Sequence, residues 1–133
     1  MFLIASVHGR ARLEFRGVAP HEGRQGNPFT LGVRLFGGAV EAQDQVYEHL
    51  PDRWTALFAE MARDWRGWEG SRSIESLEGQ LRLSATSDRL GHIRLRVELR
   101  GDPAGSDWHA ADTLFLDAGQ LDDLAERAKA YFG

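Results

Sequence analysis

Residues 81–100 read LRLSATSDRLGHIRLRVELR, and this stretch decides the fold class of the chain. Apolar side chains stand at every second position on both sides of a turn that contains Asp88 and Gly91. A two-residue period is typical of strands with one dry and one wet face, and a short turn between two such runs forces antiparallel pairing. The stretch therefore predicts an antiparallel hairpin. Its expected dry face carries Leu77, Leu81, Leu83, Ala85, Ile93, Leu95, Val97 and Leu99.

Weaker alternation predicts further strands around this hairpin. The runs lie at residues 2–7, 11–16, 29–35, 40–47 and 108–116. Gly37-Gly38 suits a two-residue turn between the third and the fourth run. Asp44 falls on the apolar side of the fourth run, which we therefore expect to be peripheral. Residues 18–28, which combine prolines and glycines with polar side chains, are expected to form a surface loop.

Two segments have the period of an amphipathic helix. The first begins near Pro51 and Asp52, which suit a first helical turn, and Gly67 is placed to end it. The second helix closes the chain. The expected apolar stripes contain Trp54, Leu57, Phe58, Met61 and Trp65 in the first helix, and Leu121, Leu124, Ala125, Ala128 and Phe132 in the second.

The order of these elements is strands, helix, strands, helix, with turns short enough for antiparallel pairing. Such an order favours an α+β fold over a parallel doubly wound sheet. We therefore predict one α+β domain over residues 1–133. It would hold a single antiparallel sheet of about six or seven strands with two amphipathic helices packed on one face.

Composition excludes several classes of function. The chain has 133 residues, a formal charge of -4 and no cysteine, which excludes disulfides, thiolate metal sites and a cysteine nucleophile. The apolar run at residues 2–7 is too short for a secretory signal or a membrane span, so we expect a cytoplasmic protein with no membrane partner. Net acidity, and the lack of outward aromatic side chains on the central strands, argue against a nucleic-acid binder.

Catalytic signatures are missing as well. The five histidines show no paired metal-ligand spacing, and there is neither a Gly-x-Ser-x-Gly elbow nor a phosphate-binding glycine loop. We therefore expect a protein that is not an enzyme, with no catalytic residue, metal or cofactor.

The wet face of the hairpin is the main candidate site. Its basic side chains are Arg82, Arg94, Arg96 and Arg100, interleaved with Glu78 and Glu98. An open sheet face with fixed arginines suits an acidic protein partner. The alternative is that cross-strand Arg–Glu pairs only keep the sheet soluble.

The segment Trp65-Arg66-Gly67-Trp68-Glu69-Gly70 is the most distinctive in the chain. In one interpretation it is structural: Trp65 completes the helix stripe and Trp68 fills the edge of the core. In the other, Trp65, Arg66 and Trp68 form a cation–π pocket. The alternative function is thus a small enzyme or small-molecule-binding domain, with a pocket near Trp65, Trp68 and the 18–28 loop.

With Ser76-Leu77-Glu78-Gly79-Gln80-Leu81 and Gly91-His92-Ile93-Arg94-Leu95, the Trp-Arg-Gly-Trp-x-Gly segment resembles a family of short bacterial proteins known only as a domain of unknown function. The resemblance implies a small cytoplasmic single-domain protein and supplies no catalytic residues. By analogy of fold and charge, such domains are similar to immunity proteins that neutralise a cognate toxin. The hypothesis is therefore a binding protein, of immunity type, that acts as a monomer or homodimer.

Overall fold

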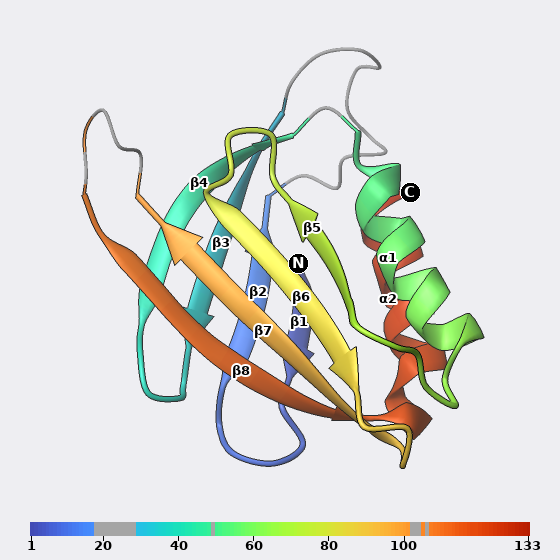
Figure 1. Cartoon of the computed structure of the whole chain (residues 1–133). Coiled ribbons are helices and arrows are strands. Elements are labelled where there is room, and N and C mark those ends of the chain that lie inside the picture. The colour runs from blue at the N-terminus through green and yellow to red at the C-terminus, as the bar shows by residue number, and fades with distance from the viewer. Residues whose placement is uncertain (18–28, 49, 102–104, 106) are drawn as a thin grey trace.

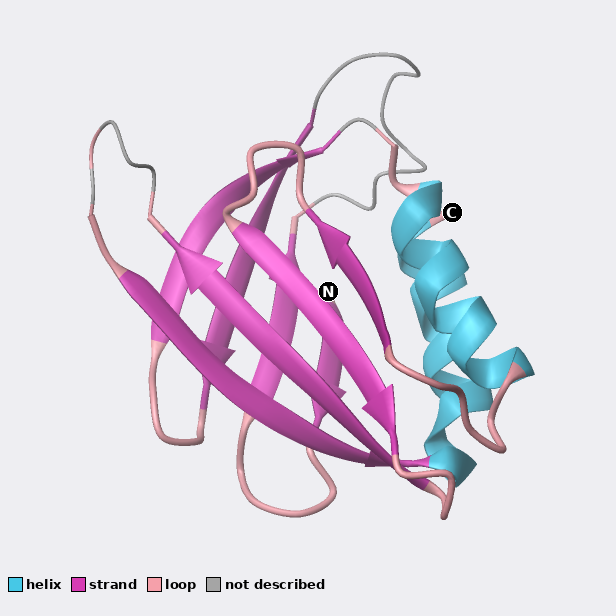
Figure 2. Cartoon of the chain, viewed as in Figure 1, coloured by secondary structure: helices cyan, strands magenta, loops and turns pink. Residues whose placement is uncertain are grey.

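The structure is a computed structural model that describes residues 1–17, 29–48, 50–101, 105 and 107–133. These residues form eight strands, two α-helices and one short 3-10 helix (Figures 1 and 2). The strands are β1 (Phe2–Ala5), β2 (Arg12–Arg16), β3 (Phe29–Phe36), β4 (Ala42–Glu48), β5 (Ser71–Glu75), β6 (Leu81–Ser87), β7 (His92–Arg100) and β8 (His109–Asp117). The helices are α1 (Asp52–Arg63), η2 (Ala118–Gln120) and α2 (Leu121–Phe132).

The strands form two antiparallel sheets of four, β1-β2-β3-β4 and β5-β6-β7-β8. The α+β class, the antiparallel pairing and the two helices are thus confirmed, and the single sheet of six or seven strands is wrong. The width of a single sheet explains why it does not form. Eight strands side by side would extend about 38 Å, whereas two helices packed together cover only about 20 Å. Each sheet therefore buries most of its apolar face against the other sheet.

The main core lies between the two sheets, which face each other as layers in Figure 1. The dry face of the 81–100 hairpin is buried as predicted from Leu81 onward, and β8 adds Leu114 and Leu116. The opposing sheet contributes Leu13, Phe15, Leu31, Val33, Leu35 and Val46. Asp44, which the sequence places on this apolar side, is half-buried on β4, the edge strand of its sheet.

The two helices fill the open side of the sandwich between β1 and β5 (Figure 2), so they do not cover a sheet face as predicted. Their apolar stripes meet a cluster of aromatic rings from β1 and β2. Ring centroids in this cluster are 5.0–6.1 Å apart, and its members are Phe2, Phe15, Trp54, Phe58, Tyr131 and Phe132. At the edge of β1, Arg127 Nη1 donates to the carbonyl of Leu3 at 2.7 Å. This contact joins α2 to the otherwise unpaired edge.

On the opposite side the sheets are tied together at their ends. The Val7 amide donates to the Phe115 carbonyl at 2.8 Å, so the β1–β2 turn lies against β8. The Ala39 amide donates to Asp112 Oδ2 at 3.0 Å, which brings the β3–β4 turn to the same strand. The edge of β8 is thereby partly covered.

Strand β5 was not predicted from the sequence, and two side chains predicted to be buried are exposed. In β5 only Ile74 is buried, so the segment shows no alternation that a sequence could reveal. Leu77, expected on the dry face, is 46% exposed in the turn between β5 and β6. Trp65, expected in the helix stripe, is 50% exposed because α1 ends two residues earlier, at Arg63.

Among the described residues, no helix has the length and apolar character that a membrane crossing requires.

Candidate functional site

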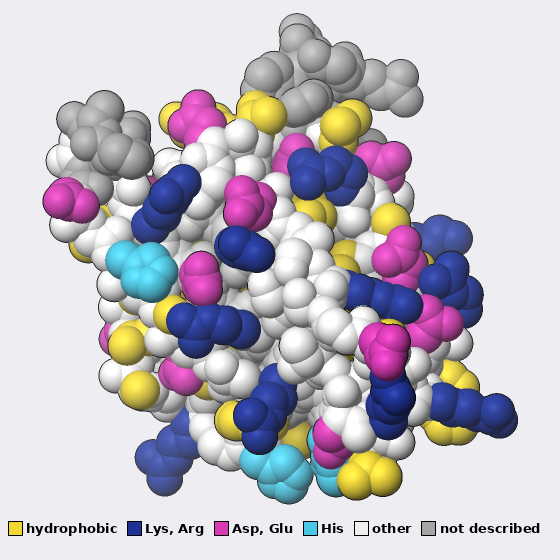
Figure 3. All heavy atoms as spheres, in the orientation of Figure 1, with side chains coloured by type: hydrophobic (Ala, Val, Ile, Leu, Met, Phe, Trp, Pro, Cys, Tyr) yellow, Lys and Arg dark blue, Asp and Glu magenta, His cyan; other side chains and the backbone are white. Residues whose placement is uncertain are grey.

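The outward side of β5–β8, which we call the arginine face, is exposed to solvent (Figure 3). All four arginines of the predicted site lie on it: Arg82, Arg94, Arg96 and Arg100 are exposed. Basic and acidic side chains alternate over much of this surface in Figure 3. The strand register explains the pattern, because residues directly opposite on neighbouring strands form rows across the sheet.

Two rows at one end of the face contain two glutamates as well as two arginines, and we call these rows the paired half. One row carries Glu75, Arg82 and Glu98, so Arg82 lies between two carboxylates. The Arg82 guanidinium is 3.5 Å from Glu75 Oε1. The next row carries Gln80, Arg100 and His109. This half holds two arginines and two glutamates; Glu75 pairs with Arg82, and Glu98 pairs with Arg96 of the neighbouring row.

Arg100 is fixed by the turn before β6. Its Nε donates to the Gly79 carbonyl at 2.9 Å. Gly79 has φ +72, and a Cβ at this position would lie 2.7 Å from Arg100 Nη2. The turn therefore needs glycine for two reasons, its backbone conformation and the guanidinium that lies over it. Around Arg100 the surface is hollowed by a cavity of about 170 Å³, lined by Glu75, Gly79, Gln80, Arg82, Glu98, Arg100 and His109.

The next two rows, which we call the open half, contain no acidic residue; the row beyond them pairs His92 with Asp117. The members of the open half are Ser71, Thr86, Arg94 and Phe115 in one row, and Ser73, Ser84, Arg96 and Thr113 in the next. Small hydroxyl side chains thus surround the two arginines, and Ser73 Oγ lies 3.1 Å from Ser84 Oγ. This half carries two positive charges on a surface of short side chains, which leaves the guanidinium groups accessible.

The two arginines of the open half differ in their contacts. Arg96 Nε donates to Glu98 Oε1 at 2.9 Å, across the boundary with the paired half. That hydrogen bond is the largest cause of a lowered pKa of the Glu98 carboxyl. Arg94 forms no ion pair with the described residues; its guanidinium lies 5.6 Å from the centroid of the Phe115 ring. Arg94 and Arg100 are thus the two arginines of the face without an ion pair to the described residues, and Arg100, unlike Arg94, is held by a hydrogen bond to the Gly79 carbonyl.

The β6–β7 turn borders the open half and is organised by Asp88. Asp88 Oδ1 accepts hydrogen bonds from the amides of Leu90 (2.7 Å) and His92 (3.1 Å), and Oδ2 lies 2.6 Å from His92 Nδ1. The Leu90 amide is the largest cause of a lowered pKa of Asp88. Both carboxylate oxygens are thus occupied within the turn.

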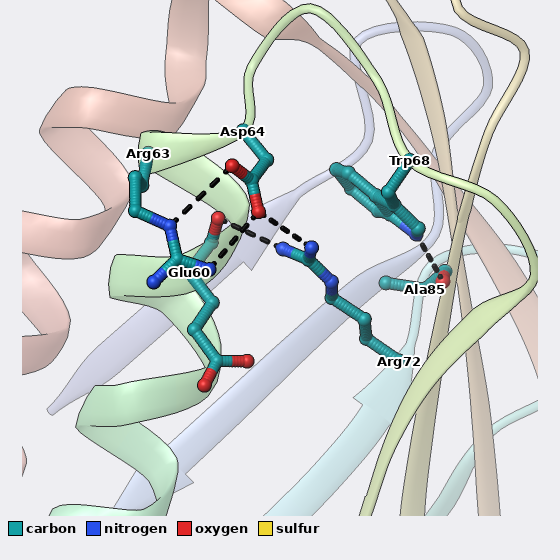
Figure 4. Close-up of polar contacts among 6 residues, drawn as sticks. All are labelled: Glu60, Arg63, Asp64, Trp68, Arg72 and Ala85. Carbon is teal, nitrogen blue, oxygen red and sulfur yellow. Dashed lines mark hydrogen bonds and ion pairs between the residues drawn. The ribbon is translucent and has the colours of Figure 1, made fainter.

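The tryptophan segment lies elsewhere, after the end of α1 (Figure 4). Trp68 is buried, its Nε1 donates to the Ala85 carbonyl at 3.1 Å, and Arg72 lies over its ring. Trp65 is exposed, with the Arg66 guanidinium 5.0 Å from its ring centroid. Trp68 therefore belongs to the core, and Trp65 and Arg66 form an exposed stack.

The predicted pocket also involved the 18–28 loop, which lies outside the described residues. Strand β2 ends and β3 begins at the end of the molecule where α1 begins, whereas Trp65 follows the other end of α1 (Figure 1). A helix of 12 residues is about 18 Å long.

Close to this segment, Asp64 anchors a small ion cluster at the end of α1 (Figure 4). It accepts hydrogen bonds from Arg63 (3.1 Å) and Arg72 (2.5 Å), and Arg72 also donates to the Glu60 carbonyl at 2.9 Å. These donors, Arg63 first, lower the pKa of Asp64 to about 2. The cluster joins β5 to α1, so we interpret it as structural.

Sequence reasoning missed the other members of the open half. Phe115 stands outward on β8 in a run that otherwise shows only weak alternation, and the serines of β5 belong to a strand that was not predicted. The outward position of Phe115 follows from the alternation of Leu114 and Leu116, which was the available signal. Within the described parts of the chain, no three His, Asp or Glu side chains come together as a metal-ligand set.

Comparison with known proteins places the chain in one family. A family model matches residues 5–133, so the chain belongs to the family of unknown function DUF6228. No curated protein and no solved structure matches it significantly.

Proposed function

We propose that this protein is a non-enzymatic binding domain whose arginine face docks onto an acidic protein surface. The observation that carries the proposal is the open half, where Arg94 and Arg96 project from a solvent-facing sheet with no carboxylate in their rows. Sheet positions are rigid, so the backbone loses little conformational entropy on binding, and the entropic cost is that of ordering the arginine side chains, about 0.5–1.5 kcal/mol each. Opposite charge on a partner would raise both association rate and specificity.

The finer proposal is an immunity-type role, in which the acidic partner is a bacterial toxin that this protein neutralises. Its support is the analogy of a small acidic α+β domain with one exposed docking surface. The alternative, a pocket near Trp65, Trp68 and the 18–28 loop, has less support because the Trp68 side chain is used in the core.

The test measures complex formation with the proteins encoded beside its gene, using the purified full chain. We expect one of them to bind, and the double variant Arg94→Glu/Arg96→Glu to weaken the complex about 100-fold, since two charge-assisted contacts are reversed. Arg12→Glu/Lys129→Glu is the matched control, because it makes the same change in net charge with exposed basic residues that lie off the arginine face. If the two double variants weaken binding equally, the site proposal is wrong.

Co-expression separates the immunity-type role from binding alone. If the bound neighbour is a toxin, the wild-type chain should restore growth of cells that produce it, and Arg94→Glu/Arg96→Glu should not. A bound neighbour without toxicity would leave the docking proposal in place and contradict the immunity-type role.

A further inference from the structure

A hollow of about 400 Å³ lies at the edge of the open half, where the β6–β7 turn and the end of β8 meet the β1–β2 turn. Its polar lining includes Thr86, Asp88, His92, Arg94 and His8, and Phe115 supplies an aromatic wall. The hollow thus combines the guanidinium of Arg94 with an apolar ring that is 39% exposed.

The acidic residue of this lining, Asp88, already accepts hydrogen bonds within its own turn. Both oxygens of Asp88 bind donors of its own turn, two backbone amides and the His92 ring. A carboxylate engaged in this way has little capacity left for a ligand cation. The hollow therefore holds one negative charge, on Asp88, whose oxygens are engaged within the turn, and one positive charge, on Arg94, whose guanidinium forms no ion pair with the described residues.

The aromatic wall is held rigidly. Both backbone groups of Phe115 on the free edge of β8 form hydrogen bonds. The Phe115 amide donates to Ser6 Oγ at 2.9 Å, and the Phe115 carbonyl accepts from the Val7 amide at 2.8 Å. The β1–β2 turn thus fixes the backbone of Phe115 on the free side of β8. Arg94 lies opposite it in the register, so both groups keep a constant separation.

We propose that this hollow is the anchor point of the interface: it takes one carboxylate side chain of an acidic partner segment at Arg94, with a neighbouring apolar side chain against Phe115. The inference rests on the proposed function and specifies the partner's chemistry. Charge complementarity selects the occupant, because the guanidinium has no carboxylate partner within the described chain. A carboxylate can accept two parallel hydrogen bonds from it.

The test uses two peptides that differ in one charge, acetyl-Leu-Glu-Leu-amide and acetyl-Leu-Gln-Leu-amide, titrated into the ¹⁵N-labelled full chain at pH 6. We expect the Glu peptide to shift the amide resonances of His92, Arg94 and Phe115 saturably, and the Gln peptide to bind about tenfold more weakly. Arg94→Gln should weaken the Glu peptide by about the same factor. Arg12→Gln, at an exposed arginine on the other sheet, is the control and should change it less than about twofold.

Three results would overturn the inference: no saturable shifts with the Glu peptide, equal affinity for both peptides, or shifts that map to the paired half. Such a failure is distinguishable from failure of the proposed function. If a partner complex is lost in Arg94→Glu/Arg96→Glu while the peptides do not bind as expected, only the anchor is wrong. If the peptides bind as expected but no neighbouring protein forms a complex, only the docking proposal is wrong.

Discussion

The paired and open halves of the arginine face lie on the same strands and carry the same number of arginines, yet their chemistry differs. In the paired half Arg82 lies between Glu75 and Glu98, and Arg100 donates to the Gly79 carbonyl. In the open half the Arg94 guanidinium forms no ion pair with the described residues and lies 5.6 Å from the centroid of the Phe115 ring. The comparison teaches that the strand register, which decides what stands opposite each arginine, separates a structural cation from one that is available to a partner.

The largest expected effect on stability comes from Gly79 in the paired half. We expect Gly79→Ala to lower the free energy of unfolding by about 2–3 kcal/mol, because the added Cβ meets Arg100 Nη2 in a backbone conformation that already costs about 1–2 kcal/mol. Gly70→Ala is the matched control, since Gly70 also has positive φ but open space around it. Urea unfolding measures both. An equal loss of unfolding free energy in both variants would mean that the Arg100 side chain moves aside without cost. The contact with Gly79 would then not fix Arg100 in the paired half.

A smaller difference should separate the two kinds of arginine. Arg100→Met removes a hydrogen bond to the chain and should lower the free energy of unfolding by about 1 kcal/mol. Arg94→Met removes no ion pair and should change it by less than about 0.5 kcal/mol. The same unfolding experiment compares them. The reverse order would contradict the division of the face into a structural and an available half.

The acid sensitivity of Asp64, which lies outside the arginine face, provides a reference for the comparison of the two halves. Because the pKa of Asp64 is lowered to about 2 in the folded chain, its contribution to stability is present above the unfolded pKa of about 3.9 and is lost as pH falls toward 2. Asp64→Asn should therefore flatten the decline of the urea midpoint between about pH 4 and pH 2. An unchanged decline would show that the Arg63 and Arg72 contacts do not persist in solution.

The smallest expected effect concerns Glu98, at the boundary between the halves. Its pKa is lowered chiefly by the hydrogen bond from Arg96, so it stabilises the fold above its unfolded pKa of about 4.3 and less as pH falls below that value. Glu98→Gln should reduce the pH dependence of stability in this range. Arg94→Gln, which touches no carboxylate, should keep the wild-type profile; a profile that changes equally in both variants would argue against the assigned pairing.

Local structure could be predicted well from the sequence where the alternation is strong. The hairpin of β6 and β7 and both helices have one buried face each, and a buried face leaves a regular apolar pattern. The β5 strand left none, because its sequence Ser-Arg-Ser-Ile-Glu buries only Ile74. Trp65 was misplaced for a related reason: helical spacing continued by chance two residues beyond the end of α1.

The tertiary arrangement was less accessible. An apolar strand face predicts that another element covers it. The pattern does not distinguish a helix from a second sheet as that element, and in this fold it is the second sheet. At the candidate site the four arginines were named correctly as outward residues. Their different neighbours followed from cross-strand register, which depends on β5 and β8 as much as on the hairpin itself.

The account is tested most directly by arginine-specific chemical modification of the protein, free and in complex with its partner, with each site quantified by peptide mass spectrometry. We predict that complex formation slows modification of Arg94 and Arg96 about tenfold or more and leaves Arg82 and Arg100 close to their rates in the free protein. Protection of Arg82 and Arg100 without protection of Arg94 would contradict the account.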